Sequence, residues 1–315
     1  MIMKISVVMT VYNGAKYLQK QMLSILQQTR LPDQIVIAND CSVDRSMELI
    51  ERLREQWPQI SWCVYTNPEN LGWQKNFMKA FEHAEGELIF CSDQDDVWTA
   101  EKIERMERAF SDYPEAELIG CDYTLIGKNG ESQGDRRLLY SPKRTCETME
   151  KIPLAPTYYE AVRPGCAIAF RKSFLQNVRS YWVQGYPHDE LLWNMAVVRG
   201  TAFVLHEVLL NYRIHGENTT SAKNTLDERI QMLEYQKNAC IQCVKYAREN
   251  GMDKKTCDML QAGVQFFEIR SKALTEKNTI SLLMVLKYFR YYTYKPAYLK
   301  DWQYLLKKYE GREMH

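Results

Sequence analysis

The sequence contains none of the common phosphate-binding signatures. It has no glycine-rich loop ending in Lys-Ser or Lys-Thr, and no GxGxxG follows its first apolar run. These absences argue against an NTPase and against a dinucleotide-dependent dehydrogenase.

Long apolar runs and an excess of charge of one sign are missing as well. No apolar run approaches the ~20 residues that a membrane-spanning helix needs, and the N-terminus lacks the layout of a signal peptide. The 41 Lys and Arg residues nearly balance the 40 Asp and Glu residues, and the net charge of +1 gives no reason to expect nucleic acid binding. We therefore expect a globular protein of the cytoplasm.

The nine cysteines show no compact disulfide framework, which fits a reducing compartment. Cys240 and Cys243 form a CxxC pair in a stretch with helical periodicity, and no second pair lies nearby. We expect these two side chains to be packed in a core rather than bound to zinc.

Apolar runs and helical patterns alternate along the first two thirds of the chain. Short β-branched runs at residues 5–10, 34–38 and 60–65 and the run that ends at Asp93 predict strands, and helical patterns separate them. Asn13 is expected to cap the first helix. This alternation predicts an α/β fold with a Rossmann-like, mostly parallel sheet and helices on both faces. From residue 121 to 159 the pattern weakens, and we expect loops there.

The character of the chain changes after about residue 220. Residues 226–249 and 253–274 show helical periodicity, and Gly251 is a plausible C-cap between them. We expect a catalytic domain at residues 1–220 and a C-terminal helical extension at residues 221–315.

The most informative stretch places Asp93, Asp95 and Asp96 directly after an apolar strand. Carboxylates bunched at a strand end repel one another, and a divalent cation makes such an arrangement favourable. Side chains alternate in extended backbone, so Asp93 and Asp95 are expected to face one way and Asp96 the other. A solvated acidic turn is the alternative. Ligands bind beyond the carboxyl ends of parallel strands, where Thr10, Asp40 and Asp93 are all predicted to lie.

Several short motifs occur in order along the chain. They are VMTVYNG at 8–14, IANDCSVD at 37–44, NLG at 70–72, FCSDQDDVW at 90–98, PHD at 187–189 and YRIHG at 212–216. In this order they resemble the family 2 glycosyltransferases, which have the GT-A fold. The sequence of the acidic stretch and of the last two motifs is most similar to the bacterial rhamnosyltransferase branch.

The resemblance implies a donor site at the strand ends. Thr10, Tyr12 and Asn13 match positions that line the nucleotide, and an aromatic ring can stack on a base. Asp40 matches a carboxylate that accepts a hydrogen bond from the N3–H of uracil or thymine. The family usually has Asp before it, where this chain has Asn39. Lys75 matches a basic residue near the donor phosphates, although a solvated helix charge is an equal alternative.

The resemblance also implies a cation, Mg²⁺ or Mn²⁺, held by oxygen ligands. Asp93 and Asp95 match the DxD pair of the family, and Asp95 is the expected direct ligand. Arg213 and His215 fall on an expected loop over the donor diphosphate, with His215 a candidate late metal ligand. A lone His is more often structural, and Asp96 is expected to hold the loop.

The acceptor side is implied by the later motifs. Asp189 matches the catalytic base, although Asp also suits a helix N-cap. Its neighbours His188 and Glu190 are further candidates. Gly165 and Cys166 match the floor below the acceptor, where a side chain larger than glycine would fill the space.

The resemblance predicts an inverting transfer of a sugar from a nucleotide diphosphate to a hydroxyl of a cell-surface polysaccharide or lipid-linked oligosaccharide. The donor implied by the branch is dTDP-rhamnose, and UDP-sugars, including a UDP-hexose, are the main alternative. A non-catalytic nucleotide-sugar binding protein and a metal-dependent phosphotransferase stay open as other classes.

Basic and aromatic residues are interleaved near the C-terminus, in residues 287–308. Such a mixture suits a membrane–water interface, so we consider peripheral contact with the inner face of the cytoplasmic membrane. Helices that pack on the catalytic domain or on a second subunit of a homodimer are the equal alternative.

Overall fold

The computed structural model describes residues 3–133, 148–215 and 225–306. These residues form two compact units. The first contains the described residues up to 153 together with 161–215, and the second contains 154–160 together with 225–306. The short segment 154–160 packs with the C-terminal helices, which the sequence pattern did not predict.

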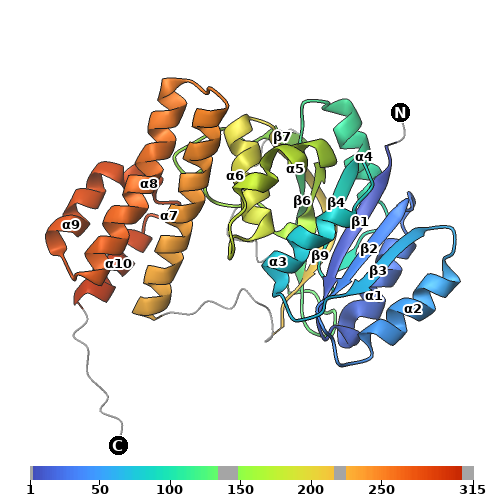
Figure 1. Ribbon diagram of the computed structural model, residues 1–315. Helices are drawn as coiled ribbons and strands as arrows, with labels where there is room; N and C mark the ends of the chain where they lie inside the picture. Colours follow the sequence, from blue (N-terminus) through green and yellow to red (C-terminus); the bar gives the residue numbers. More distant parts are fainter. Residues whose placement is uncertain (1–2, 134–147, 216–224, 307–315) are drawn as a thin grey trace, which may run out of the picture. The chain divides into compact units, whose positions relative to one another are not determined.

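The first unit is built on one mixed sheet (Figure 1). Its strands run in the order β3-β2-β1-β4-β8-β6-β9-β5, and β7 pairs with β9. Strands β1 to β4 are mutually parallel, whereas β5, β7 and β8 join their neighbours antiparallel. The strands are β1 (Ile5–Val11), β2 (Gln34–Asn39), β3 (Ser61–Thr66), β4 (Leu88–Ser92), β5 (Val97–Trp98), β6 (Leu118–Ile126), β7 (Met149–Lys151), β8 (Ile168–Arg171) and β9 (Ala202–Arg213).

Helices cover both faces of this sheet. Alternate residues of β1, among them Val7 and Met9, share one apolar core with α1 (Ala15–Leu26), α2 (Ser46–Gln56) and α4 (Lys102–Asp112). The opposite face carries α3 (Trp73–Ala80) and α6 (His188–Arg199), with α5 (Lys172–Val178) beside α6. The predicted fold class is confirmed, and the carboxyl ends of β1, β2 and β4 lie at one edge of the sheet.

Two local predictions were wrong. Residues 118–126 form β6, the strand with the most extensive pairing to β9, although a loop was expected from residue 121. The glycine and the polar residues of β6 interrupt the apolar pattern by which strands are recognised, and the strand is stabilised by long-range pairing. Asn13 does not cap α1. The N-cap is Gly14, without a side-chain bond, and the side chain of Asn13 turns to the neighbouring loop.

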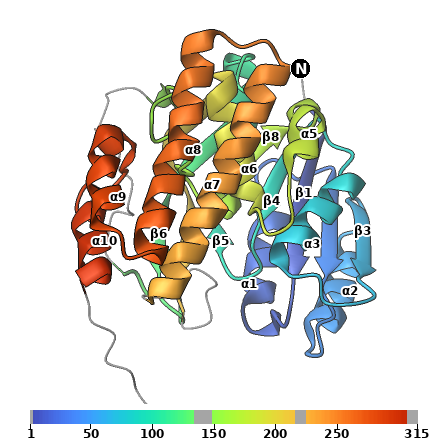
Figure 2. The same cartoon turned by 60° about the vertical axis from the view of Figure 1, so that its left-hand side comes forward.

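The second unit is helical. It contains α7 (Leu226–Glu249), α8 (Lys254–Thr275), α9 (Thr279–Met284), the 3₁₀ segment η4 (Val285–Tyr291) and α10 (Ala297–Leu306). Helices α7 and α8 lie side by side in both ribbon views (Figures 1 and 2). Gly251 adopts φ +62 in the turn between them, directly after the C-cap Asn250, as expected of a helix-ending glycine. Cys240 and Cys243 are fully buried side chains of α7, so the prediction that they pack in a core is confirmed.

The buried side chain of Asp301 in α10 links several elements of the second unit. Its carboxylate is fully buried and accepts bonds from Arg270 Nε at 2.9 Å, Arg229 Nη2 at 3.2 Å and the Tyr292 hydroxyl at 2.8 Å. A buried charge is tolerated when it is paired and hydrogen-bonded in this way. No helix among the described residues is long and apolar enough to cross a membrane.

Candidate active site

The loops that follow β1 and β2 are bonded to each other. Asn13, with φ +50, donates its backbone N–H to Ser42 Oγ and accepts from Val43 N through its side chain, each at 2.9 Å. Asp44 accepts from Ala15 N at the start of α1 and from Ser46 N at the start of α2. The two loops therefore form one rigid floor at the sheet edge, next to the end of β1 where Thr10 lies.

Tyr12 stands on this floor with 52% of its surface exposed, available to stack on a planar ligand. Its backbone is held by Gln94, whose side-chain amide accepts from Tyr12 N and donates to Tyr12 O. Gly14 makes this possible, since a Cβ there would lie 2.3 Å from Gln94 Oε1. Gln94 was not among the predicted site residues, because a glutamine between acidic residues carries no recognisable signal.

The carboxylate of Asp40 organises the loop before α3. It is 3% exposed and accepts from Asn67 Nδ2 at 2.8 Å and from the backbone N–H groups of Leu71 and Gly72 at 2.9 Å each. Two oxygens offer about four acceptor positions, so one remains for a base N–H. Lys75 is exposed on α3 in the turn that follows this loop.

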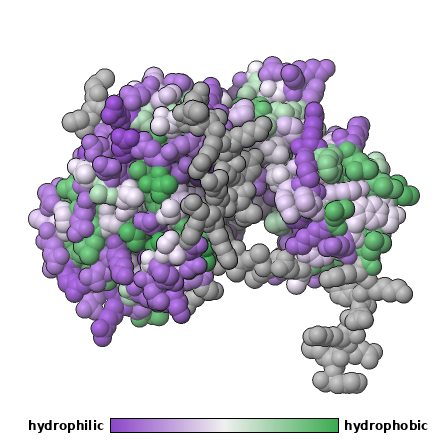
Figure 3. All heavy atoms as spheres, turned by 180° about the vertical axis from the view of Figure 1, so that it is seen from behind, coloured by the Kyte–Doolittle hydropathy of each residue, from purple (hydrophilic) through white to green (hydrophobic). Residues whose placement is uncertain are grey.

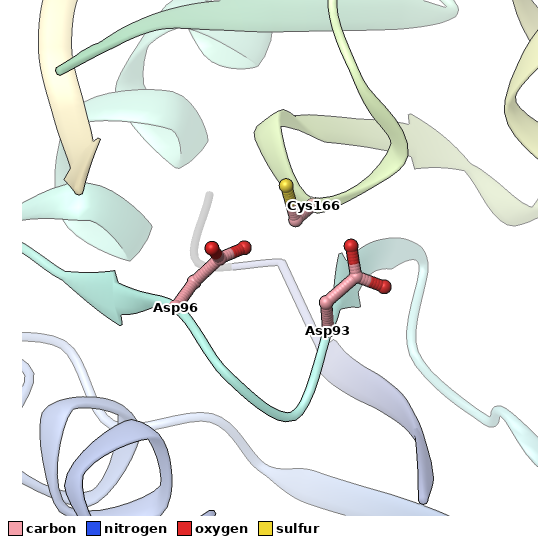
Figure 4. Close-up of side chains that lie close together, drawn as sticks. All are labelled: Asp93, Asp96 and Cys166. Carbon is pink, nitrogen blue, oxygen red and sulfur yellow. The ribbon is translucent and has the colours of Figure 1, made fainter. Parts of the chain in front are cut away.

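The acidic stretch lies in a turn between β4 and β5, and its side chains do not alternate as predicted. Asp93 and Asp96 converge with the thiol of Cys166, and one ligand atom from each lies within 4.8 Å of the others (Figure 4). Asp95 turns instead to His215, with 2.8 Å between Asp95 Oδ2 and His215 Nε2. The alternation rule failed because it holds only in extended backbone, and residues 93–96 form a bend.

This crowding changes the acidity of the cluster. Burial, with the charges of Asp96, Asp95 and Asp189, holds the pKa of Asp93 well above its usual range. Burial and the charge of Asp95 raise the pKa of Asp96 to about 7. Burial likewise keeps the pKa of the Cys166 thiol well above normal, so this sulfur is a neutral and poor ligand for a hard cation.

A buried lysine lies beneath the cluster. Lys102, at the start of α4, is fully buried, donates to the backbone oxygen of Cys166 at 2.6 Å and lies 4.0 Å from the centre of the Trp98 ring. Its charge partly offsets the rise in the pKa of Asp96. The residue was missed because a lysine in an amphipathic helix normally indicates a solvated surface.

Arg213 is a structural clamp at the end of β9, not part of a loop as expected. It is 2% exposed, its backbone N–H donates to Asp96 Oδ1, and its Nε donates to the Asp95 backbone oxygen at 2.6 Å. A further bond to the Gly127 oxygen at 2.9 Å occupies the guanidinium with backbone partners. Direct donor binding by Arg213 stays a prediction, and this burial argues against it.

Asp189 lies in the first turn of α6, as predicted, and faces the cluster. It accepts from Gly165 N at 3.1 Å and from the N–H of its neighbour Glu190 at 3.0 Å. Its charge contributes to the high pKa of Asp93. A Cβ at Gly165 would meet His188 Nε2 at 2.9 Å and Asp189 Cβ at 3.4 Å, so glycine is the residue that allows these two side chains to pack this closely against the backbone at position 165.

His188 itself is part of an aromatic core. It is 3% exposed, stacks on Phe77 with 3.9 Å between ring centres, and meets Trp73 and Phe81 edge-on. Burial lowers its pKa to about 4, and neither ring nitrogen has a partner. Its predicted contact with the acceptor is not favoured by this burial. Glu190 is partly exposed and stays a candidate.

The residues present fit a hard divalent cation. Asp96 Oδ2 is a buried oxygen with no hydrogen-bond partner among the residues that the structure describes, and three carboxylates share one turn. A cation that also touches a ligand must be reachable, and the side chains of Asp95 and His215 keep 19% and 11% exposure, whereas Asp96 keeps 1%. Asp95 and His215 therefore form the more accessible pair of candidate ligands, whereas Asp93 and Asp96 face Cys166.

Residues 6–179 match the model of the glycosyl transferase family 2. The chain belongs to this family. An uncharacterised glycosyltransferase of Nostoc sp. is 30% identical over 226 residues, which are 69% of this chain and 66% of that relative. The dTDP-rhamnosyl transferase RfbG of Shigella flexneri is 23% identical over 305 residues, covering 89% of this chain and all of that relative.

Solved structures share the fold of this glycosyltransferase. Residues 1–349 of TarS from S. aureus, in complex with UDP-GlcNAc, superimpose with a TM-score of 0.63 at 17% identity and cover 96% of this chain and 88% of that one. The mannosyltransferase PcManGT of Pyrobaculum calidifontis, in complex with GDP-Man and Mn²⁺, gives 0.53 at 14% identity, covering 96% and 85%. The family assignment makes the chain a nucleotide-sugar-dependent glycosyltransferase.

Proposed function

We propose that this protein is an inverting glycosyltransferase that depends on Mg²⁺ or Mn²⁺ and takes its sugar from a thymidine or uridine diphosphate. Rhamnose is the first candidate sugar, because the name of RfbG specifies dTDP-rhamnose and that relative is matched along its whole length. The acceptor is a hydroxyl group of a glycan. A UDP-hexose donor is the alternative.

The observation that carries the proposal is the position of Asp189 beside the acidic turn. The Gly165 N–H holds one oxygen of its carboxylate at 3.1 Å, and the missing Cβ at Gly165 lets the side chains of His188 and Asp189 pack closely against this backbone. The α6 N-terminus favours the ionised form of an acid in its first turn. Asp189 can therefore remove the proton of an acceptor hydroxyl as that oxygen attacks the anomeric carbon.

The donor would lie across the floor made by the loops after β1, β2 and β4. Tyr12 offers the exposed ring for the base, and Asp40 offers its remaining acceptor position to the N3–H of uracil or thymine. A cation held by Asp95 and His215 would neutralise charge on the leaving diphosphate. The acceptor oxygen approaches from the Asp189 side, opposite to the leaving group, so the configuration at the anomeric carbon inverts.

A thermal-shift panel tests the donor half of this proposal. UDP and dTDP, alone and as sugar conjugates, are compared with CDP at equal concentration, with and without Mn²⁺. We expect the uracil and thymine nucleotides to raise the melting temperature in the presence of Mn²⁺ and CDP to have a much smaller effect, because cytosine lacks the N3–H that a carboxylate requires. Equal shifts with CDP would contradict the role of Asp40.

Product analysis tests the transfer half. With the best donor and a glycan acceptor, NMR of the anomeric proton should show a glycoside of opposite configuration to the donor. Retained configuration would contradict the inverting mechanism. Nucleotide-sugar binding with no product from any acceptor would favour a binding protein.

A further inference from the structure

The surface formed by α9, η4 and α10, here called the α9–α10 surface, is apolar where a helical unit is normally polar. Eight of its large apolar side chains are at least 36% exposed, and Ile280 is the most exposed at 69%. A single exposed apolar residue needs no explanation, but a group of them on one surface does. Figure 3 shows hydrophobic side chains gathered at the edge where these elements lie. The exposed residues are Ile280, Leu283, Met284, Leu286, Phe289, Tyr294, Leu299 and Leu306.

The charges on the same surface have one sign. Residues 277–306 contain a single acidic residue, Asp301, and its carboxylate is fully buried between two arginines of the second unit. The exposed charged side chains of this segment are therefore all basic. They are Lys277, Lys287, Arg290, Lys295 and Lys300.

The rest of the second unit does not share this pattern. Helix α7 carries charges of both signs that pair along the helix, as Lys237 does with Glu234 and Lys245 with Glu249. The separation of charge within one small unit is thus specific to the α9–α10 surface. Aromatic rings accompany the cations, with Lys295 Nζ 4.9 Å from the centre of the Phe289 ring.

We propose that the α9–α10 surface binds the face of an anionic lipid bilayer, with the apolar side chains entering the headgroup region and the basic side chains contacting lipid phosphates. Basic and apolar residues on one face are what an interfacial helix requires, and a negatively charged leaflet attracts juxtamembrane cations. This binding is peripheral, since no described helix spans a bilayer.

A second copy of the chain fits this surface less well. A two-fold dimer would bring the same patch against itself, so Lys287 and Arg290 would meet basic residues with no exposed acid on the surface to pair with them. Like charges facing each other at an interface are unfavourable, and interface cores are depleted of lysine. A bilayer with anionic headgroups supplies the missing negative charge.

Flotation of the full chain with vesicles tests the proposal. We expect binding to vesicles of mixed phosphatidylglycerol and phosphatidylcholine, none to phosphatidylcholine alone, and loss of binding at high salt. Lys287→Glu with Arg290→Glu should lower the partition coefficient about 25-fold or more, at about five-fold for each charge removed. Leu283→Ser with Met284→Ser should weaken binding without changing its salt dependence.

The matched control reverses two exposed lysines of the same unit, Lys254 and Lys255 at the start of α8, and changes the net charge equally. Lys254→Glu with Lys255→Glu should bind vesicles as the unchanged protein does, and circular dichroism should show the same helix content for all variants. Equal losses in both pairs, or no binding to anionic vesicles at low salt, would overturn the proposal. So would a dimer, seen by sedimentation equilibrium, that Leu283→Ser with Met284→Ser dissociates.

Discussion

The side-chain amide of Gln94 bonds to both backbone polar groups of Tyr12, accepting from its N–H at 2.9 Å and donating to its carbonyl oxygen at 3.0 Å. The amide thus satisfies both backbone polar groups of Tyr12, as a neighbouring strand would do in a sheet. Because Gln94 lies between Asp93 and Asp95, it couples the loop under the proposed base to the turn that holds the proposed cation. Gly14 is the residue whose lack of a Cβ permits this contact.

We expect Gln94→Ala to weaken donor binding about five- to thirty-fold, since two exposed hydrogen bonds that fix Tyr12 are lost and each is worth ~0.5–1 kcal/mol. Titration of UDP by calorimetry measures this change. Gln94→Glu keeps the acceptor for Tyr12 N but loses the donor to Tyr12 O. Its affinity for UDP should therefore lie between that of the unchanged protein and that of Gln94→Ala. Gly14→Ala should weaken binding similarly, and Gly14→Ala with Gln94→Ala should cost little more than either alone. Additive losses would show that Gly14 acts independently of Gln94.

Asp189→Asn should reduce transfer about 10²–10⁴-fold while the affinity for UDP stays within about two-fold, because the amide cannot accept the acceptor proton. Asn keeps one oxygen for the Gly165 N–H, but its amide nitrogen then faces the Glu190 N–H, so circular dichroism must show that the variant is folded like the unchanged protein. Glu190→Gln is the matched control on the next residue of α6 and should change the rate much less. Ordinary turnover by Asp189→Asn would remove Asp189 from the mechanism.

The contrast between Asp95 and Asp96 gives a test of the cation site. Asp95→Ala and His215→Ala should each weaken Mn²⁺ binding in the presence of UDP by about ten-fold or more, measured from the free Mn²⁺ signal in electron paramagnetic resonance. Asp96→Asn should have a smaller effect, because the amide oxygen can still accept from Arg213 N and Asp96 does not reach the surface. If Asp96→Asn abolished Mn²⁺ binding while Asp95→Ala did not, the cation would belong to the Asp93, Asp96 and Cys166 cluster.

The sequence predicted those parts of the molecule that depend on local periodicity. The strands at 5–11, 34–39 and 88–92 and the long helices at 226–249 and 254–275 lie within a few residues of their predicted ranges, since each has a clear apolar repeat. Strand β6 was missed because its pairing with β8 and β9 is long-range and leaves no local pattern.

In the site, too, features with a local sequence pattern were predicted and features set by long-range contacts were not. The sequence placed Thr10, Asp40 and Asp93 at the carboxyl ends of β1, β2 and β4, because strand ends are readable from sequence. The roles of Gln94 and Lys102 were invisible, since each depends on a partner far along the chain, Tyr12 for one and Cys166 for the other. The direction in which Asp95 and Asp96 point depends on the geometry of a turn, which side-chain alternation does not describe.

Asp40→Asn separates a structural role from a role in base recognition. One of the backbone N–H groups of Leu71 and Gly72 would then face an amide N–H, so we expect the free energy of unfolding to fall by about 1–3 kcal/mol, measured by urea denaturation. If Asp40 also contacts the base, the preference for UDP over CDP should disappear. A variant that loses stability but keeps this preference would limit Asp40 to holding the loop.

His188 should make the protein less stable in mild acid. Its pKa is about 4 in the folded protein and 6.5 for an unperturbed imidazole, so between these values the unfolded chain binds a proton that the folded chain does not. Stability therefore falls as the pH drops through this window, by about 2 kcal/mol at about pH 5. His188→Phe keeps a ring against Phe77 and removes the titration. The difference in unfolding free energy between about pH 7.5 and pH 5 should be about 2 kcal/mol smaller in this variant than in the unchanged protein, and an equal difference in both would show that His188 is not the group that titrates.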